Sequence, residues 1–127
     1  MVFLPPDVPE RRVLSPQSVV SSAVIDQSTN TLTAAIDLGT ARLAAILMPA
    51  AWDAAQLTFQ ASADGVAWVD LYDASGNEVV VEAAADRAIV VPVNDFLGVR
   101  HLKVRSGTAG VPVNQAAPRT LTLVSRP

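Results

Sequence analysis

Residues 57–71 read LTFQASADGVAWVDL, and this stretch decides the fold. Leu57 and Phe59 alternate with Thr58 and other polar residues, which is the period-two pattern of a strand with one face in a core. Asp64-Gly65 follows, a dipeptide that supplies the positive φ angles of a tight hairpin turn. A second apolar run comes next. The stretch therefore predicts two antiparallel strands that share one buried face.

The same alternation recurs along most of the chain. It is clear at residues 99–106, and again near the C-terminus, where Leu121 and Leu123 alternate with threonines. Turn-forming residues separate the runs at intervals of about ten residues, as in sandwich and jelly-roll domains. The predicted strands are residues 18–25, 31–38, 42–48, 56–62, 67–72, 78–82, 87–92, 99–106 and 119–125.

These strands predict an all-β domain over residues 18–127. The expected architecture is an antiparallel β-sandwich of the jelly-roll or discoidin-like type, because each strand offers one apolar and one polar face. Single helical turns are predicted between strands at residues 49–55 and 83–86.

Residues 1–17 carry a different, proline-rich pattern. Four of the nine prolines lie within residues 3–16. Proline fixes φ and biases the preceding residue toward extended structure, so we predict an extended N-terminal arm. The arm packs along its own domain, lies on a neighbouring subunit, or remains a disordered tail. Its candidate partner-binding residues are Phe3, Leu4, Pro5, Pro6, Val8, Arg11 and Arg12.

Composition limits the classes of function. Charged residues make up 17% of the chain against about a quarter in soluble domains, which suggests that other copies or a partner cover part of the surface. An alanine-rich composition explains part of this deficit by itself. A net charge of −3 with scattered basic residues argues against binding to nucleic acid. With no cysteine, no leader-like N-terminus and no apolar run of membrane length, folding in the cytoplasm is expected.

Few side chains suggest catalysis. His101 is the only histidine, it stands beside Arg100 and Lys103, and no nucleophile motif surrounds the nearby Ser106. We therefore expect His101 to face solvent from a strand. Neither enzyme activity nor a cofactor is expected.

Two groups of residues allow two interpretations each. Trp68 and Tyr72 share a parity and are candidate ligand-facing aromatics of a sugar platform with Trp52, although aromatic side chains are more often buried. An oxygen-rich cluster at two loops either forms turns or binds Ca²⁺. Its spacing does not match a calcium loop, so turn formation is the prediction. The cluster consists of Asp64, Asp70, Asp73, Asn77 and Glu78.

Two resemblances add expectations that the residues alone do not provide. The hairpin at residues 57–71 resembles one that is common in discoidin-like β-sandwiches. Residues 43–123 are similar to a class of small structural proteins of tailed bacteriophages and prophages. The segments that carry this similarity are 48–52, 57–60, 70–73 and 105–108, which read MPAAW, LTFQ, DLYD and RSGT.

The second resemblance implies a virion protein that folds in the host cytoplasm. It suggests a capsid decoration or cement protein that bridges subunits of the major capsid protein, or contacts other virion proteins, as a homo-oligomer. Two alternatives remain open, namely a carbohydrate-binding module and a head–tail or tail accessory protein.

Overall fold

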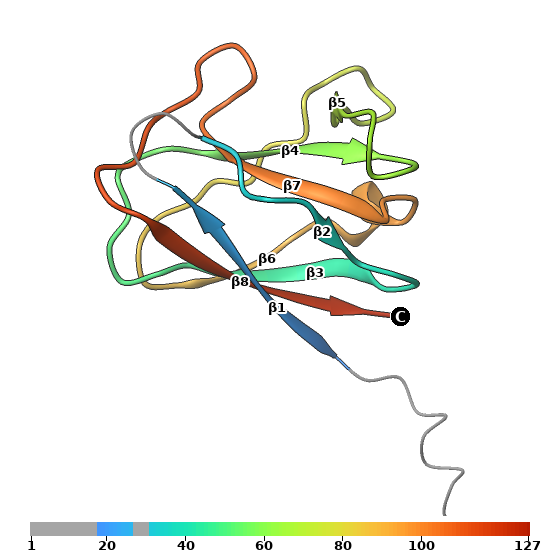
Figure 1. Ribbon diagram of the computed structural model, residues 1–127, viewed down its shortest axis with the longest axis horizontal. Helices are drawn as coiled ribbons and strands as arrows, with labels where there is room; N and C mark the ends of the chain where they lie inside the picture. Colours follow the sequence, from blue (N-terminus) through green and yellow to red (C-terminus); the bar gives the residue numbers. More distant parts are fainter. Residues whose placement is uncertain (1–17, 27–30) are drawn as a thin grey trace, which may run out of the picture.

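The computed structural model describes residues 18–26 and 31–127. This part of the chain contains eight strands and one 3-10 turn, which loops connect (Figure 1). The predicted arm at residues 1–17, with its candidate binding residues, lies outside the described part. The elements are β1 (Val19–Ile25), β2 (Ile36–Asp37), β3 (Arg42–Leu47), β4 (Leu57–Ser62), β5 (Val69–Asp70), β6 (Ala88–Val90), η2 (Val93–Phe96), β7 (His101–Ser106) and β8 (Arg119–Arg126).

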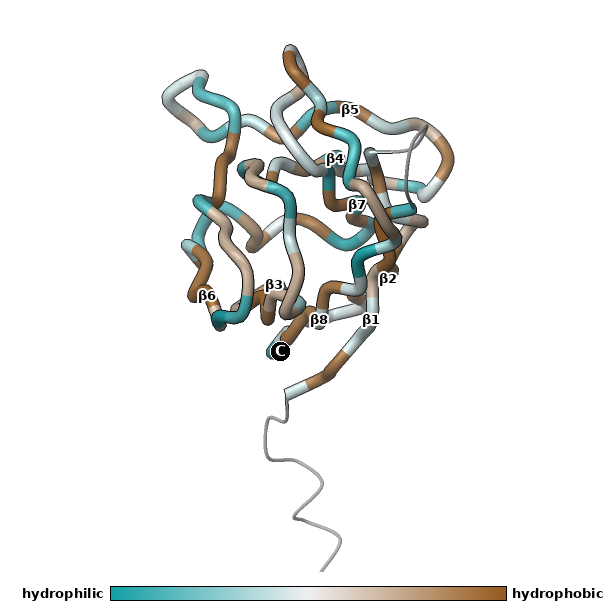
Figure 2. The backbone as a smooth tube through the Cα atoms, turned by 90° about the vertical axis from the view of Figure 1, so that its left-hand side faces the viewer, coloured by the Kyte–Doolittle hydropathy of each residue, from teal (hydrophilic) through white to brown (hydrophobic). Residues whose placement is uncertain are grey.

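The strands form two four-stranded antiparallel sheets with the orders β1-β8-β3-β6 and β2-β7-β4-β5. β1 pairs with β8, β2 with β7, β3 with β6, and β4 with β5. The chain is therefore one long antiparallel ribbon that is rolled up so that its two halves face each other, which is the jelly-roll arrangement. Figure 2 shows the two layers from the side. The predicted β-sandwich is confirmed.

The inner faces of the two sheets supply the core. Leu121 and Leu123 of β8 are fully buried, as their alternation with threonines predicts. Phe59 of β4 meets Phe96 of η2 edge to face, with ring centroids 5.0 Å apart, and both rings are fully buried. Aromatic pairs in this geometry contribute beyond their buried area. The Phe59–Phe96 contact thus joins a central strand to the turn before β7.

Four predicted strands are wrong or much shorter in the structure, and those at residues 67–72 and 87–92 are reduced to Val69–Asp70 and Ala88–Val90. Residues 78–82 form no strand and make only isolated bridges, such as Leu57 with Val81. Val79 and Val81 are nonetheless buried, because the segment crosses the core and its alternation reflects burial rather than a ladder. The strand predicted at residues 31–38 is reduced to Ile36–Asp37, with further bridges at Leu32 and Thr33.

The two predicted helical turns are also wrong. The backbone N–H of Met48 donates to the carbonyl of Arg87, and that of Asp86 donates to the carbonyl of Pro49. Both bonds continue the β3–β6 pairing, the second joins residues 49–55 to residues 83–86, and Asp86 has a positive φ of 60°. The 3-10 turn lies instead after Pro92.

Replacement of Phe59 tests the core. Phe59→Ala is expected to lower the free energy of unfolding by about 4 kcal/mol, because it removes the ring contact and leaves a cavity. Chemical denaturation measures the change. Phe59→Leu keeps most of the buried volume and should lose less than half as much. A loss below about 1 kcal/mol for Phe59→Ala would contradict this account of the core.

Candidate functional site

The outer side of the sheet β1-β8-β3-β6 carries charge within its strands only at one end, where Arg42 of β3 pairs with Arg126 of β8. Cross-strand register places Val20 beside Val124, Val124 beside Ala45, and Ala45 beside Val90 in one continuous row. A second row runs parallel to it through Ser22. We call this surface the apolar face. It consists of Val20, Ser22, Val24, Ala45, Leu47, Ala88, Val90, Thr120, Thr122 and Val124.

Several side chains of the apolar face are open to solvent. Val90 is 84% exposed and Val20 is 66% exposed, and Val24 and Leu47 are also exposed. Charged side chains stand at one end of the face, where Arg42 lies opposite Arg126 in register. A contiguous exposed apolar surface with charges at its border is typical of a protein–protein interface.

The outer side of the other sheet, β2-β7-β4-β5, carries charged side chains that form hydrogen bonds and ion pairs with one another. Arg105 of β7 is 5% exposed, and its guanidinium donates to the Asp70 carboxylate at 2.5 Å and to that of Glu78 at 3.3 Å. It also donates to the hydroxyl of Thr58, and Glu78 accepts the backbone N–H of Ala109. The hydrogen bond from Arg105 is the main cause that lowers the pKa of Asp70. This network fixes two loops on the sheet.

The predicted turn role of the oxygen-rich cluster is confirmed at two of its residues. The carboxylate of Asp64 accepts the N–H groups of Val66 and Ala67, and that of Asp73 accepts the N–H of Asn77. The other two carboxylates, as described above, bind Arg105. Over residues 18–26 and 31–127, no group of three His, Cys, Asp or Glu side chains could hold a metal ion.

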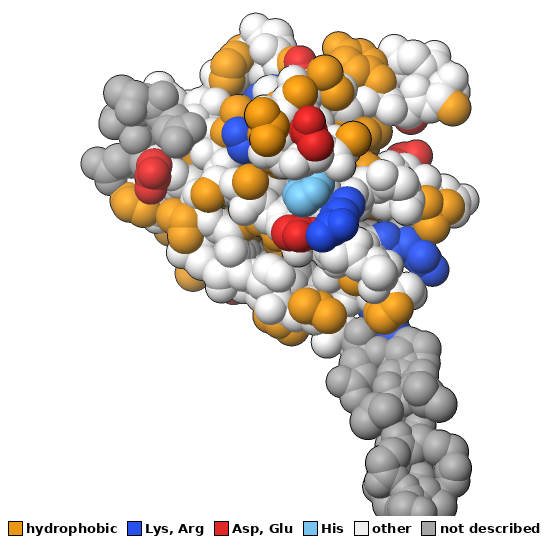
Figure 3. Space-filling view, turned by 45° about the vertical axis from the view of Figure 1, so that its right-hand side comes forward, with side chains coloured by type: hydrophobic (Ala, Val, Ile, Leu, Met, Phe, Trp, Pro, Cys, Tyr) orange, Lys and Arg blue, Asp and Glu red, His pale blue; other side chains and the backbone are white. Residues whose placement is uncertain are grey.

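A serine, a histidine and an aspartate share one row of the charged sheet, which sequence reasoning missed. Register places His101 between Ser62 and Asp37. However, the Asp37 carboxylate pairs with Arg100 at 2.9 Å, and the Ser62 hydroxyl donates to Asp64 at 2.9 Å. His101 is half-buried and surrounded by charged side chains (Figure 3). The row therefore has a hydroxyl and a carboxylate that are held by other partners.

Ser106 is equally unavailable as a nucleophile. It is buried at the other end of β7, where its hydroxyl accepts a hydrogen bond from Gln115 at 2.9 Å. Gln115 also bonds to the backbone of Asp53 in both directions. This buried group connects the segment before β8 to the loop before β4.

The three candidate aromatic residues do not form one platform. Trp52 packs against the core and donates its indole N–H to the carbonyl of Ala55. Trp68 lies just before β5, and the Lys103 ammonium stands 4.5 Å from its ring centroid, a cation–π contact. Tyr72 is 54% exposed. A ligand at Trp68 would have to compete with Lys103 for one face of the ring.

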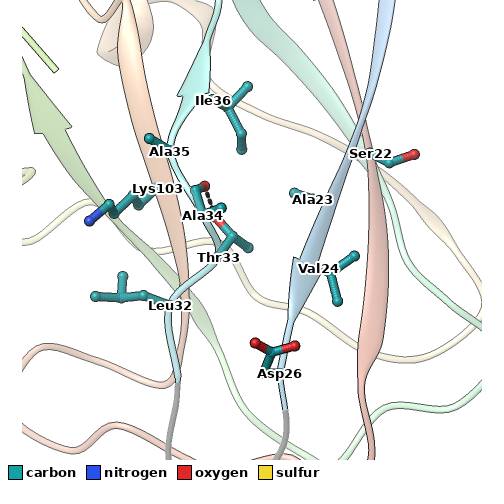
Figure 4. A pocket seen from close by; sticks show the side chains of 10 residues that line it. All are labelled: Ser22, Ala23, Val24, Asp26, Leu32, Thr33, Ala34, Ala35, Ile36 and Lys103. Atoms are coloured by element: carbon teal, nitrogen blue, oxygen red, sulfur yellow. Dashed lines mark hydrogen bonds between the residues drawn. The ribbon is translucent and has the colours of Figure 1, made fainter.

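A groove of about 520 Å³ runs between β1 and residues 31–36, along one open side of the sandwich. Ala23 and Ile36 point toward each other across it, whereas Lys103 turns away (Figure 4). Small and apolar side chains form most of its walls, with Asp26 at one end. The groove is a gap between two sheet edges, and its polar groups do not converge on a common point.

No family model, curated protein or solved structure matches the chain. The resemblances to phage structural proteins and to discoidin-like domains therefore remain predictions. Within the described residues, no helix has the length and apolar character that a membrane crossing requires.

Two arginine–aspartate pairs in and beside β7 allow a matched comparison. The Arg105 side chain is 7% exposed and that of Arg100 is 61% exposed. Arg105→Met should lower the free energy of unfolding by about 2 kcal/mol, because it leaves two partly buried carboxylates without their partner. Arg100→Met should change it far less, because solvent screens this exposed pair. Similar losses for both variants, measured in urea, would contradict a structural role for the Arg105 network.

Acid should weaken the hairpin turn at Asp64. Hydrogen bonds from the N–H groups of Ala67 and Val66 lower the pKa of Asp64 from 3.8 to about 2. Since the folded pKa lies below the ordinary one, the contribution is complete above about pH 4 and is lost as the pH falls toward 2. Asp64→Asn should therefore show a smaller decrease in unfolding free energy over this range than the wild type. Identical pH dependence in the two proteins would contradict the assignment.

Proposed function

We propose that this protein is a non-enzymatic structural protein that binds other protein subunits through the apolar face. More specifically, we propose a capsid decoration protein of a tailed bacteriophage that bridges subunits of the major capsid protein in the virion. The apolar face is the observation that carries the first statement. The similarity of residues 43–123 to phage structural proteins supports the second.

The physics of the apolar face suits attachment to a large assembly. Burial of apolar surface contributes about 25 cal/mol per Å², and it needs no charge complementarity. One small face gives a weak contact, but a symmetric shell repeats the contact at many equivalent sites. If copies are linked to each other, avidity strengthens the attachment without any new kind of contact.

The side chains that could have served catalysis or sugar binding are engaged in structural contacts, and this supports the proposal. Ser62, Ser106 and Asp37 are each held by a structural partner, which does not favour acyl-transfer or hydrolytic chemistry. Lys103 covers part of Trp68, which weakens the case for a sugar platform. A carbohydrate-binding module and a tail accessory protein remain as outcomes of the test below.

Co-sedimentation with empty capsids tests the proposal. The capsids are assembled from the major capsid protein encoded in the same genome. Wild-type protein should bind them saturably at a fixed ratio to the capsid subunit. Val90→Asp should weaken this binding at least tenfold, because it places an unpaired charge in an apolar contact.

Val66→Asp is the matched control for this experiment. Val66 is 81% exposed and Val90 is 84% exposed, but Val66 lies in the loop between β4 and β5, away from the apolar face. Val66→Asp should bind capsids like the wild type. Equal weakening by both variants would contradict the role of the apolar face. No capsid binding, together with binding to tail assemblies or to a glycan array, would overturn the capsid proposal.

A further inference from the structure

The four edge strands of the sandwich are not protected equally. An edge strand offers unpaired N–H and C=O groups, and proteins usually blunt it by shortness, charge or proline. β2 and β5 have two residues each, of which Asp37 and Asp70 are charged. β6 has three residues, with Arg87 before it and Pro92 shortly after it. These three edges carry the usual protection.

β1 is the exception. It has seven residues, VVSSAVI, without a charge or a proline. Within the described residues β1 pairs with β8 alone along its length, and a single bridge joins Ile25 to Thr33 at its C-terminal end. Val19–Val24 thus form a long, neutral edge that can accept a further strand.

We propose that two copies of the protein pair through β1, antiparallel and about a two-fold axis. A two-fold contact uses the same surface on both copies, so the strand must be compatible with itself. β1 meets this condition because it has no charge that would oppose its own copy. This inference concerns a contact between copies and holds whether or not the apolar face binds a capsid.

The side chains of β1 suit a register that is centred on Ser22. Directly opposed residues of antiparallel strands lie on the same face. Ser22 would face the partner's Ser22, and Val20 would face the partner's Val24 on the outer side. On the inner side, Ser21 would face the partner's Ala23. This register leaves Ile25 with its existing bridge to Thr33.

The groove beside β1 gives room for the added strand. Its volume is about 520 Å³, and its opposite wall includes Ala34 and Ala35. The inward residues that a second β1 would bring are a serine and an alanine, both small. A neutral strand with small inward side chains therefore fits this side of the sandwich better than a charged or bulky one.

Pairing through β1 would also enlarge the apolar face. Strands lie about 4.8 Å apart with a rise of about 3.4 Å per residue, so a four-stranded face five residues deep covers roughly 300 Å². Stable interfaces bury about 800 Å² per partner. The eight-stranded sheet of a dimer would double the continuous face. A second copy is thus the occupant that gives the apolar face a size closer to that of a stable interface.

Cysteine cross-linking tests the pairing directly, because the natural chain has no cysteine. Full-length Ser22→Cys should form a disulfide-linked dimer under mild oxidation at least tenfold faster than Ser75→Cys. Ser75 lies in an exposed turn between β5 and β6, away from β1. Equal rates for the two variants would overturn the proposed pairing.

The mass in solution provides the second readout. Wild-type protein should sediment as a dimer of twice the 13.3 kDa chain mass. Ser22→Lys should raise the dimer dissociation constant at least tenfold, because it sets two like charges against each other, whereas Ser75→Lys should not. A monomeric wild type, or a dimer that Ser22→Lys leaves intact, would overturn the inference. Loss of capsid binding in Val90→Asp without loss of the dimer would separate the two contacts.

Discussion

The position of β8 between β1 and β3 is the constraint on which the rest of the structure depends. The pairing of β8 with β1 brings the last strand beside the first, so that Val19 lies opposite Ser125 in register. Closing so long a loop costs conformational entropy, although the cost rises only slowly with length. Burial of Leu121 and Leu123 against the other sheet offsets it. The sheet that carries the apolar face therefore cannot be complete until the last strand has joined, and such non-local pairing folds slowly.

The two outer faces of this sandwich differ in composition and in the contacts of their side chains. On the sheet β2-β7-β4-β5, Arg105 binds two carboxylates and a hydroxyl, which secures loops that would otherwise lie free on the surface. On the sheet β1-β8-β3-β6, valine, leucine, alanine, serine and threonine cover four strands, and the charges in these strands on that side, Arg42 and Arg126, lie at one end. The shortage of charged residues in the chain thus falls mainly on one face of the sandwich. A uniform alanine-rich composition would have diluted charge on both faces.

Alternation predicted the strands that lie inside a sheet and the long edge strand β1, but it overestimated the length of the three short edge strands β2, β5 and β6. β4, β7 and β8 have two neighbours or a full core face, so their apolar residues repeat with period two as expected. Val79 and Val81 show the same repeat in a segment that only crosses the core. Periodicity reports which side chains are buried, whereas a strand also needs a backbone partner, and that partner is set by distant segments. For the same reason the strand order was not readable from the sequence.

The candidate functional surfaces were harder to predict than the core. Val20 and Val124 belong to segments about a hundred residues apart, and only register makes them neighbours of Ala45 and Val90. The sequence did contain a signal, since β1 has no charged residue and β8 alternates buried leucines with neutral residues between Arg119 and Arg126. β1 belongs to both the apolar face and the unprotected edge. A single lysine on the outer side of β1 would protect the edge strand against pairing, and it would also interrupt the apolar face. The other three edges are blunted, so the neutrality of β1 is the feature that the proposed capsid contact and the proposed pairing of two copies both require.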